Sequence, residues 1–446
     1  QKRTVVRKTL TGAKLTVDRP DLKGARFVAA IDFGSTTLAG YLVDLSSGEI
    51  VAQTSRENSQ IRFGGDILTR VSHTERYPDG LATLTRLARE DVNAVLAILT
   101  KRAGEPIASV SICGNSVMQS FLMGWAVDQL GVFPFEPVST SPQLLRGKDM
   151  GLDSAPDIEV YVFPMEAGFV GGDNVAAILA TGIHKSDLPS LLMDIGTNGE
   201  IVCGSSKGLW CASTPTGPAF EGGEIMHGMR AAPGAIDSVR VDSTTPRFVI
   251  TTIGGQKPVG LCGSAIIDCV AQFYAAGIAD RDGAFTSSRT MRTRADGIKE
   301  VVICGPKMPA LTPDGLVLEG EKDICFTQKD YREVQLAKGA LATGAELLMR
   351  KAGMAEAERV LIAGGFGSYI SVESALGIGL LPTRDASRVE ICGNSAGLGA
   401  AMVAASLEAR AEAEEIARKT IHIPLPDEPD FAERLVEHIA MPHVPR

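Results

Sequence analysis

Residues 27–37 read Phe-Val-Ala-Ala-Ile-Asp-Phe-Gly-Ser-Thr-Thr, an apolar run that passes into an aspartate, a glycine and three hydroxyl side chains. Residues 191–200 read Leu-Leu-Met-Asp-Ile-Gly-Thr-Asn-Gly-Glu and repeat this order. A short apolar run that ends in glycine and hydroxyl residues predicts a buried strand followed by a tight turn. The same event occurs twice, 162 positions apart (194 − 32).

The segments after each turn also correspond. We expect strands at Phe27–Ile31, Leu38–Leu45 and Ile50–Gln53 in the first half, and at Leu191–Met193, Ile201–Cys203 and Leu209–Ser213 in the second. Later in each half an apolar strand meets a glycine turn and then a helix, at 110–116 and at 360–368. This predicts a duplicated α/β fold with two lobes and a cleft between them, where α/β proteins favour ligands.

Three segments have helical spacing, namely Leu81–Leu99, Val334–Met349 and Ala400–Lys419. The last is rich in Ala, Glu and Arg, so we interpret it as one solvent-exposed helix. Residues 280–330 are rich in turn signals and weakly periodic, and they suggest no particular element.

The predicted domains are residues 1–26, 27–187 and 188–446. The first is basic and weakly apolar, which is typical of a linker or of the end of an upstream domain. The other two are the lobes, and we expect the C-terminal helices of the second to pack back on the first.

Composition excludes several classes of function. A net charge of −9 disfavours a nucleic-acid partner, because phosphate contacts require a basic surface. No apolar run is long enough to span a membrane or to act as a secretion signal, so we expect a cytoplasmic protein. The eight cysteines include no Cys-x-x-Cys pair, and most lie in apolar runs that indicate buried thiols.

The two turns have the chemistry of phosphate sites. Glycine lacks the Cβ that would keep a phosphate from the backbone N–H groups, and hydroxyl side chains add donors. The aspartates Asp32 and Asp194 can hold Mg²⁺ directly or through water. Other nucleotide motifs are absent, since the chain has no G-x-x-x-x-G-K-[ST] loop and no G-x-G-x-x-G after a strand.

Together with Ala363-Gly364-Gly365, these turns resemble the phosphate-1, phosphate-2 and adenosine motifs of the actin, sugar-kinase and heat-shock-chaperone ATPase superfamily. Residues 172–180 and 393–400 resemble the two helices that connect the lobes there, and a carboxylate stands at Asp173. The resemblance implies that ATP contacts Gly34, Ser35, Thr36, Thr37, Gly196, Thr197, Asn198, Gly199, Gly364, Gly365, Phe366, Gly367 and Ser368. It makes Asp32, Asp173 and Asp194 the catalytic residues, with Asp173 orienting or deprotonating the attacking water.

Within this superfamily the chain most resembles the reductive activators of corrinoid proteins, which restore cobalt(I) in methyltransferase systems at the expense of ATP. The segments that carry this resemblance are residues 114–118, 168–173, 217–223, 260–268 and 431–436. The resemblance implies a corrinoid protein or corrinoid-dependent methyltransferase as partner, and it leaves a homodimer open.

The chain departs from these activators in one respect. They deliver the electron through a two-iron two-sulfur domain held by four cysteines, and no ferredoxin-like cysteine spacing occurs here. We therefore expect the cluster only in a domain absent from this chain. Two other functions fit the scaffold, a small-molecule kinase and a non-catalytic ATP-gated clamp. Another relative, the activator of 2-hydroxyacyl-CoA dehydratases, holds a four-iron cluster at a dimer interface, and only Cys262 on its glycine-rich turn suggests that arrangement.

Overall fold

The first half of the chain begins with the predicted three-stranded meander. The computed structural model describes residues 10–153, 155–242, 245, 247–286, 288, 290–367 and 370–443. Its first sheet has six strands in the order β3-β2-β1-β4-β6-β5. These strands are β1 (Phe27–Phe33), β2 (Thr37–Asp44), β3 (Glu49–Glu57), β4 (Ile107–Gly114), β5 (Gln143–Arg146) and β6 (Glu159–Val162).

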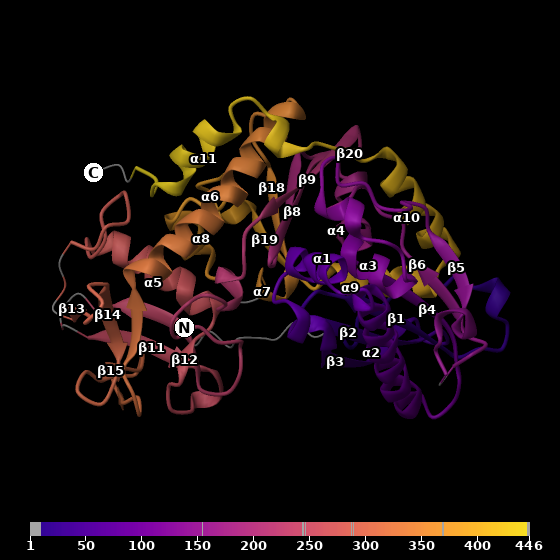
Figure 1. Ribbon diagram of the computed structural model, residues 1–446, viewed down its shortest axis with the longest axis horizontal. Helices are drawn as coiled ribbons and strands as arrows, with labels where there is room; N and C mark the ends of the chain where they lie inside the picture. Colours follow the sequence, from indigo (N-terminus) through magenta and orange to yellow (C-terminus); the bar gives the residue numbers. More distant parts are fainter. Residues whose placement is uncertain are drawn as a thin grey trace. The chain divides into compact units, whose positions relative to one another are not determined.

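The central strand β1 is buried on both faces. Its residues Phe27 to Ile31 are all buried, as expected for a strand that pairs in parallel with β4 and antiparallel with β2. Helix α2 (Gly80–Ala103) packs on β2 and β3, next to α1 (Ile67–Arg76) and α3 (Ser116–Met123) (Figure 1). Helices α4 (Gly172–Thr181) and α9 (Ser395–Ala405) pack against each other, and both contact β4.

A second six-stranded sheet repeats this arrangement. Its order is β19-β18-β7-β8-β9-β20, so the meander β7-β8-β9 is followed by β18 beside β7, as β1-β2-β3 is followed by β4 beside β1. The predicted α/β fold with a repeated meander is thereby confirmed. The strands are β7 (Ser190–Ile195), β8 (Asn198–Ser205), β9 (Gly208–Pro215), β18 (Arg359–Ala363), β19 (Val389–Gly393) and β20 (Ile421–His422).

The chain forms two compact units. Unit 1 comprises Gln1–Leu192, Val202–Ala212 and Cys392–Ile423, and unit 2 comprises Met193–Ile201, Ser213–Ile391 and Pro424–Arg446. The predicted division at residues 26 and 187 stays a prediction. Among the residues that the structure describes, no helix combines the length and apolarity needed to cross a membrane.

Unit 2 contains two further sheets. Their strands lie within residues 280–330, for which the sequence suggests no element, and in the segment just before. One has the order β12-β10-β11-β15-β16 and the other β13-β14-β17. Their strands are β10 (Ala235–Val241), β11 (Phe248–Thr252), β12 (Gly260–Leu261), β13 (Met291–Thr293), β14 (Lys299–Cys304), β15 (Ala310–Leu311), β16 (Val317–Leu318) and β17 (Ile324–Thr327). Most are two to six residues long, which is too short to give a periodic signal.

Unit 2 also contains several helices, the first two of which pack on these sheets. They are α5 (Gly263–Ala275), α6 (Gln328–Lys351), α7 (Gly364–Gly367), α8 (Val372–Gly377) and α11 (Phe431–Ile439). Helix α11 runs alongside α6 (Figure 1). This contact is close because Gly339 of α6 faces Ile439, and a Cβ at Gly339 would lie 3.0 Å from the Ile439 side chain.

The predicted single helix at Ala400–Lys419 is wrong. The chain forms α9 and α10 (Leu407–Lys419), separated at Ser406, whose backbone is extended and whose hydroxyl accepts a hydrogen bond from Ala409 N. Almost all of α9 is buried, whereas α10 buries only one face. The charged residues of α10 dominated the sequence pattern and concealed an apolar helix before it.

Residues 10–26 hydrogen-bond to other parts of unit 1. Asp18 N donates to Ala405 O at 2.9 Å, and Leu407 N donates to Asp18 O at 2.9 Å. The buried Arg19 side chain donates to Ala404 O at 2.8 Å and to Glu159 Oε1 at 2.9 Å. This segment therefore attaches to the joint between α9 and α10.

Candidate functional site

The first predicted phosphate turn follows β1 in unit 1. Asp32 is partly exposed, and its Oδ2 accepts a hydrogen bond of 2.8 Å from Asn394 Nδ2 at the start of α9. Burial raises the pKa of Asp32 to about 6, while the Asn394 hydrogen bond lowers it. The carboxylate is therefore mainly ionised at neutral pH.

Buried polar side chains hold the carbonyl groups of this turn. Arg70 Nη2 donates to Ser35 O at 2.7 Å, and Asn58 Nδ2 donates to Gly34 O at 3.0 Å. Burial lowers the pKa of Arg70 to about 10, so the guanidinium stays charged at neutral pH. Since these donors occupy the carbonyls, the backbone is held in one conformation. Neither residue was predicted, because a buried arginine on an amphipathic helix has no distinguishing sequence signal.

The turn is also tight enough to require glycine. A Cβ at Gly34 would lie 2.8 Å from Thr37 O, closer than non-bonded atoms can approach without moving the backbone. Ser35 and Thr36 are partly exposed and Thr37 is exposed. Their side chains therefore remain accessible to a ligand, as the phosphate prediction requires.

Asp173 lies in the first turn of α4 in unit 1. The N-cap of α4 is Gly171, and the Asp173 carboxylate accepts a hydrogen bond of 2.9 Å from Asn174 N. Gly171 is required because a Cβ there would lie 2.5 Å from the backbone of Asn115. Asp173 thus stands one residue inside a helix whose start is packed tightly against the end of β4.

A second carboxyl group beside Asp173 was not predicted. Glu166 accepts hydrogen bonds of 3.0 and 2.9 Å from Asn174 Nδ2. Burial raises the pKa of Glu166 well above its usual range, the Asn174 amide opposes this, and the charge of Asp173 adds to it. Asn174 is 2% exposed, and its Oδ1 has no hydrogen-bond partner. A carboxyl group whose pKa is strongly raised by burial is a candidate member of a functional site.

The second predicted turn lies in unit 2 and brings two of the predicted motifs together. A Cβ at Gly364, whose φ is 91°, would lie 2.5 Å from Asp194 Oδ1 and 3.0 Å from Ile195 O. Asp194 and the adenosine-type motif are therefore in direct contact, although about 170 residues (364 − 194) separate them.

Hydroxyl groups organise this second turn. Thr216 Oγ1 lies 2.8 Å from both Gly196 O and Thr197 O, and Thr197 Oγ1 donates to Glu221 Oε1 at 3.0 Å. At Gly199 a Cβ would lie 2.4 Å from the Leu341 side chain. Glu221 belongs to the segment 217–223, which the family resemblance had marked without giving it a role.

The adenosine-type motif continues into the short helix α7. Apart from its chain neighbours, no atom of the described residues lies within 4 Å of the Cβ position of Gly365. Phe366 and Gly367 belong to α7, and nothing is described of their side chains. Ser368 lies outside the described residues.

The cysteines of the chain occupy dispersed, mostly buried positions. Seven are buried and Cys392 is intermediate, and no three His, Cys, Asp or Glu residues are grouped for a metal within the described part of the chain. Cys262 is the N-cap residue of α5, where it is 3% exposed, and burial raises its pKa. A neutral buried thiol is a poor metal ligand.

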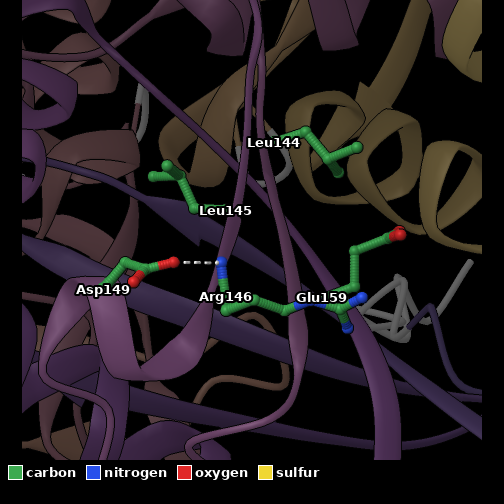
Figure 2. A pocket seen from close by; sticks show the side chains of 5 residues that line it. All are labelled: Leu144, Leu145, Arg146, Asp149 and Glu159. Carbon is green, nitrogen blue, oxygen red and sulfur yellow. Dashed lines mark hydrogen bonds between the residues drawn. The ribbon is translucent and has the colours of Figure 1, made fainter.

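Two surface pockets lie away from the predicted residues. One, of about 230 Å³, is lined by Leu144, Leu145, Arg146, Asp149 and Glu159 (Figure 2). The Glu159 carboxylate pairs with Arg19 and Arg410. The other, of about 560 Å³, lies in unit 2 among Arg292, Arg294, Glu300 and Asp323, which pair with one another. Neither pocket contains a residue of the predicted turns.

Comparison with known proteins identifies the family. One family model, described as the RACo middle region, matches residues 27–186, and another, the C-terminal domain of RACo, the ASKHA domain, matches residues 189–446. The chain belongs to the RACo family. The actin-like ATPase fold of its second part and the predicted resemblance to corrinoid activators are thereby confirmed.

RACo relatives match most of the chain. The corrinoid activation enzyme RamQ of Eubacterium limosum is 35% identical over 421 residues, which cover 91% of this chain and 68% of RamQ. A [Co(II) methylated amine-specific corrinoid protein] reductase of Methanosarcina barkeri is 24% identical over 79% of this chain and 65% of its own length. The solved structure of a reductive activator for corrinoid, iron–sulfur protein is 33% identical, with a TM-score of 0.83 over 94% of this chain and 66% of that chain. The chain thus spans about two thirds of the length of these relatives.

Proposed function

We propose that this chain is the ATPase portion of an activator that reduces the cobalt of a corrinoid protein from cobalt(II) to cobalt(I). The observation that carries the proposal is the second turn, where Gly364 lies against Asp194 at a distance that leaves no room for a Cβ. This approach supports a nucleotide site because it joins the phosphate-type and adenosine-type motifs of one unit.

The residues present suit ATP and Mg²⁺. Glycine at 34, 199 and 364 lets the turns pack closely, and the hydroxyls of Ser35, Thr36, Thr37 and Thr197 can donate to phosphate oxygens. Mg²⁺ commonly takes only one or two protein carboxylates and completes its shell with water and phosphate, so Asp32 and Asp194 would suffice. When bound, the ion would neutralise charge on the phosphates.

Different residues of the chain would then have different roles in ATP hydrolysis. Asp32 and Asp194 would hold Mg²⁺ directly or through water, and Asp173 would orient or deprotonate the attacking water. Backbone N–H and hydroxyl donors of both turns stabilise charge on the γ-phosphate. Burial favours the neutral form of Glu166, which contacts Asn174 next to Asp173.

Reduction of cobalt requires one electron from outside these residues. We propose that an iron–sulfur domain gives this electron to cobalt(II) and is itself oxidised. ATP contributes only if its bound and hydrolysed states bind the corrinoid protein with different affinity, since a ligand without such a difference shifts no equilibrium.

The test is nucleotide affinity in a glycine variant. Gly364→Ala places a methyl group against Asp194 and strains a backbone with φ of 91°, so we expect Kd for ATP to rise about 10-fold or more. Gly353→Ala is the control, because Gly353 also has a positive φ (65°) but no atom within 4 Å of its Cβ position. Calorimetry that finds equal Kd values in both variants, or no ATP binding by the wild type, contradicts the proposal.

A further inference from the structure

Asn394 joins the first turn to helix α9. Its Nδ2 donates to Asp32 Oδ2 at 2.8 Å and to Tyr41 Oη at 3.1 Å, and its Oδ1 accepts a hydrogen bond of 2.6 Å from Gly397 N. Asp32 and Asn394 are 362 residues apart in the sequence, and both belong to unit 1. One amide group thus serves both a helix N-terminus and the first aspartate of the nucleotide motif.

The orientation of this amide is fixed by chemistry. A backbone N–H can only donate, so the atom facing Gly397 N must be the amide oxygen, and the NH₂ group must face Asp32. Only this orientation of the Asn394 amide satisfies the hydrogen bond from Gly397 N. In this orientation the NH₂ group donates to Asp32 Oδ2, which accepts.

The start of α9 is shaped to place Asn394 there. A Cβ at Gly397 would lie 2.5 Å from the Tyr41 ring, so α9 approaches β2 closely only because residue 397 is glycine. On the neighbouring strand, Cys113 stands opposite Asp32 in the register of β4, and its thiol donates to Ala396 O at 3.6 Å. Contacts from β2 and β4 thus hold the first turn of α9 against the aspartate.

We propose that Asn394 is the positioning residue of Asp32, fixing its carboxylate in the orientation that Mg²⁺-nucleotide binding uses. This rests on the proposed nucleotide site and adds a residue to which no role has been given. Asn394 needs no contact with nucleotide, because it acts through the aspartate. It also makes the orientation of Asp32 depend on the position of α9.

The test is a double-mutant cycle on Mg²⁺-dependent ADP binding. Asn394→Ser keeps an N-cap acceptor for α9, since serine is among the preferred caps, but its short side chain cannot reach Asp32. The variants Asn394→Ser, Asp32→Ala and the double variant are compared with wild type. Calorimetry gives Kd for ADP with Mg²⁺ and with excess chelator, and their ratio is the gain that Mg²⁺ provides.

We expect Asn394→Ser to reduce this gain about 10-fold while Kd in chelator changes less than about twofold. In the double variant the gain should be no smaller than in Asp32→Ala alone, because Asn394 has nothing left to position. Ser406→Ala is the control. It removes the N-cap hydrogen bond of α10 at the far end of α9, so it should lower Tm and leave the gain unchanged.

Two results overturn the positioning role while the proposed function stands. One is a full Mg²⁺ gain in Asn394→Ser with a lowered Tm, as for Ser406→Ala. The other is additive losses in the double variant. A wild-type chain that binds ADP under neither condition overturns the proposed function, and the role of Asn394 with it.

Discussion

Asp173 lies where a structural and a catalytic role can be separated by experiment. Its carboxylate accepts a hydrogen bond from Asn174 N of its own helix, and Gly171, not Asp173, is the N-cap residue of α4. An acidic residue in a first helical turn is worth about 0.3–1 kcal/mol through the helix dipole. A large effect on hydrolysis would have to come from chemistry.

We therefore expect Asp173→Asn to lower kcat for ATP hydrolysis about 100-fold and to change Kd for ATP less than about threefold. The control is Glu408→Ala, which removes an exposed acidic residue from the first turn of α10. It should leave both constants unchanged. Normal hydrolysis by Asp173→Asn would assign Asp173 to helix stability alone.

Some residues of the site can be predicted from local sequence patterns, and others cannot. Asp32 and Asp194 are conspicuous because strand, turn and hydroxyls follow one another locally. Arg70, Asn58 and Asn394 are not, since each acts on the first turn through a hydrogen bond that spans 24 to 362 residues. No local pattern encodes such contacts, and only the fold brings them together.

Among the secondary-structure elements, helices α4 and α9 are in unusually close contact. A Cβ at Gly399 would lie 2.0 Å from Ala176 O, a backbone atom that cannot move without moving α4. In a free helix, alanine is favoured over glycine by about 1 kcal/mol. Here the collision should outweigh that preference.

We expect Gly399→Ala to lower the free energy of unfolding by about 1–3 kcal/mol, as overpacking of a close contact does. Gly65→Ala is the control, because the Cβ position of Gly65 has no atom within 4 Å. Urea denaturation measures both. An unchanged or increased stability of Gly399→Ala would mean that the two helices are not in this contact in solution.

The contact between α6 and the segment after α11 depends on a buried lysine. Lys338 is 1% exposed, and its Nζ donates to Ala440 O at 2.6 Å. Burial, and secondarily the charge of Arg281, lowers the pKa of Lys338 to about 8. Between that value and the ordinary value of 10.5, the unfolded chain binds more protons than the folded chain.

Stability contributed by this group therefore rises as pH increases from about 8 to about 10, by up to about 3 kcal/mol, and is constant below pH 8. The measurement is Tm of wild type and Lys338→Met at pH 7.5 and pH 9.5. The Tm of wild type should rise relative to the Tm of Lys338→Met between pH 7.5 and pH 9.5. Equal changes in Tm for the two proteins would contradict a lowered pKa of Lys338.

Elements were predictable where their signal was long or repeated. The meander strands and the helices predicted at 81–99 and 334–349 are present, although α6 begins at Gln328, before its predicted start at Val334. The break at Ser406 was missed because a serine between two helix-forming runs reads as helix, while tertiary contacts with Asp18 hold it extended. The short strands of unit 2 depend on similar long-range pairing.

For the whole molecule, the duplicated order of strands was the property most readily derived from sequence. Two turns with the same chemistry at the ends of equivalent strands predicted the α/β fold, and both six-stranded sheets contain that meander. The narrower function followed from resemblance to a family, and membership in the RACo family supports it. Physical reasoning alone indicates a phosphate site but not which reaction uses it.

The most direct test of the proposed function follows the cobalt oxidation state by visible absorbance. The probe is a cobalt(II) corrinoid protein purified from a methylated-amine methyltransferase system. It is mixed with this chain and a reduced iron–sulfur domain from a relative, with or without Mg-ATP. Asp173→Asn provides the hydrolysis-deficient control, and omission of the iron–sulfur domain removes the electron donor.

We predict that cobalt(I) forms only when Mg-ATP and the iron–sulfur domain are both present. Without that domain, the chain should still bind the corrinoid protein in an ATP-dependent manner and leave cobalt(II) unchanged. Cobalt(I) formation at the same rate and to the same extent with and without ATP would contradict the proposed function.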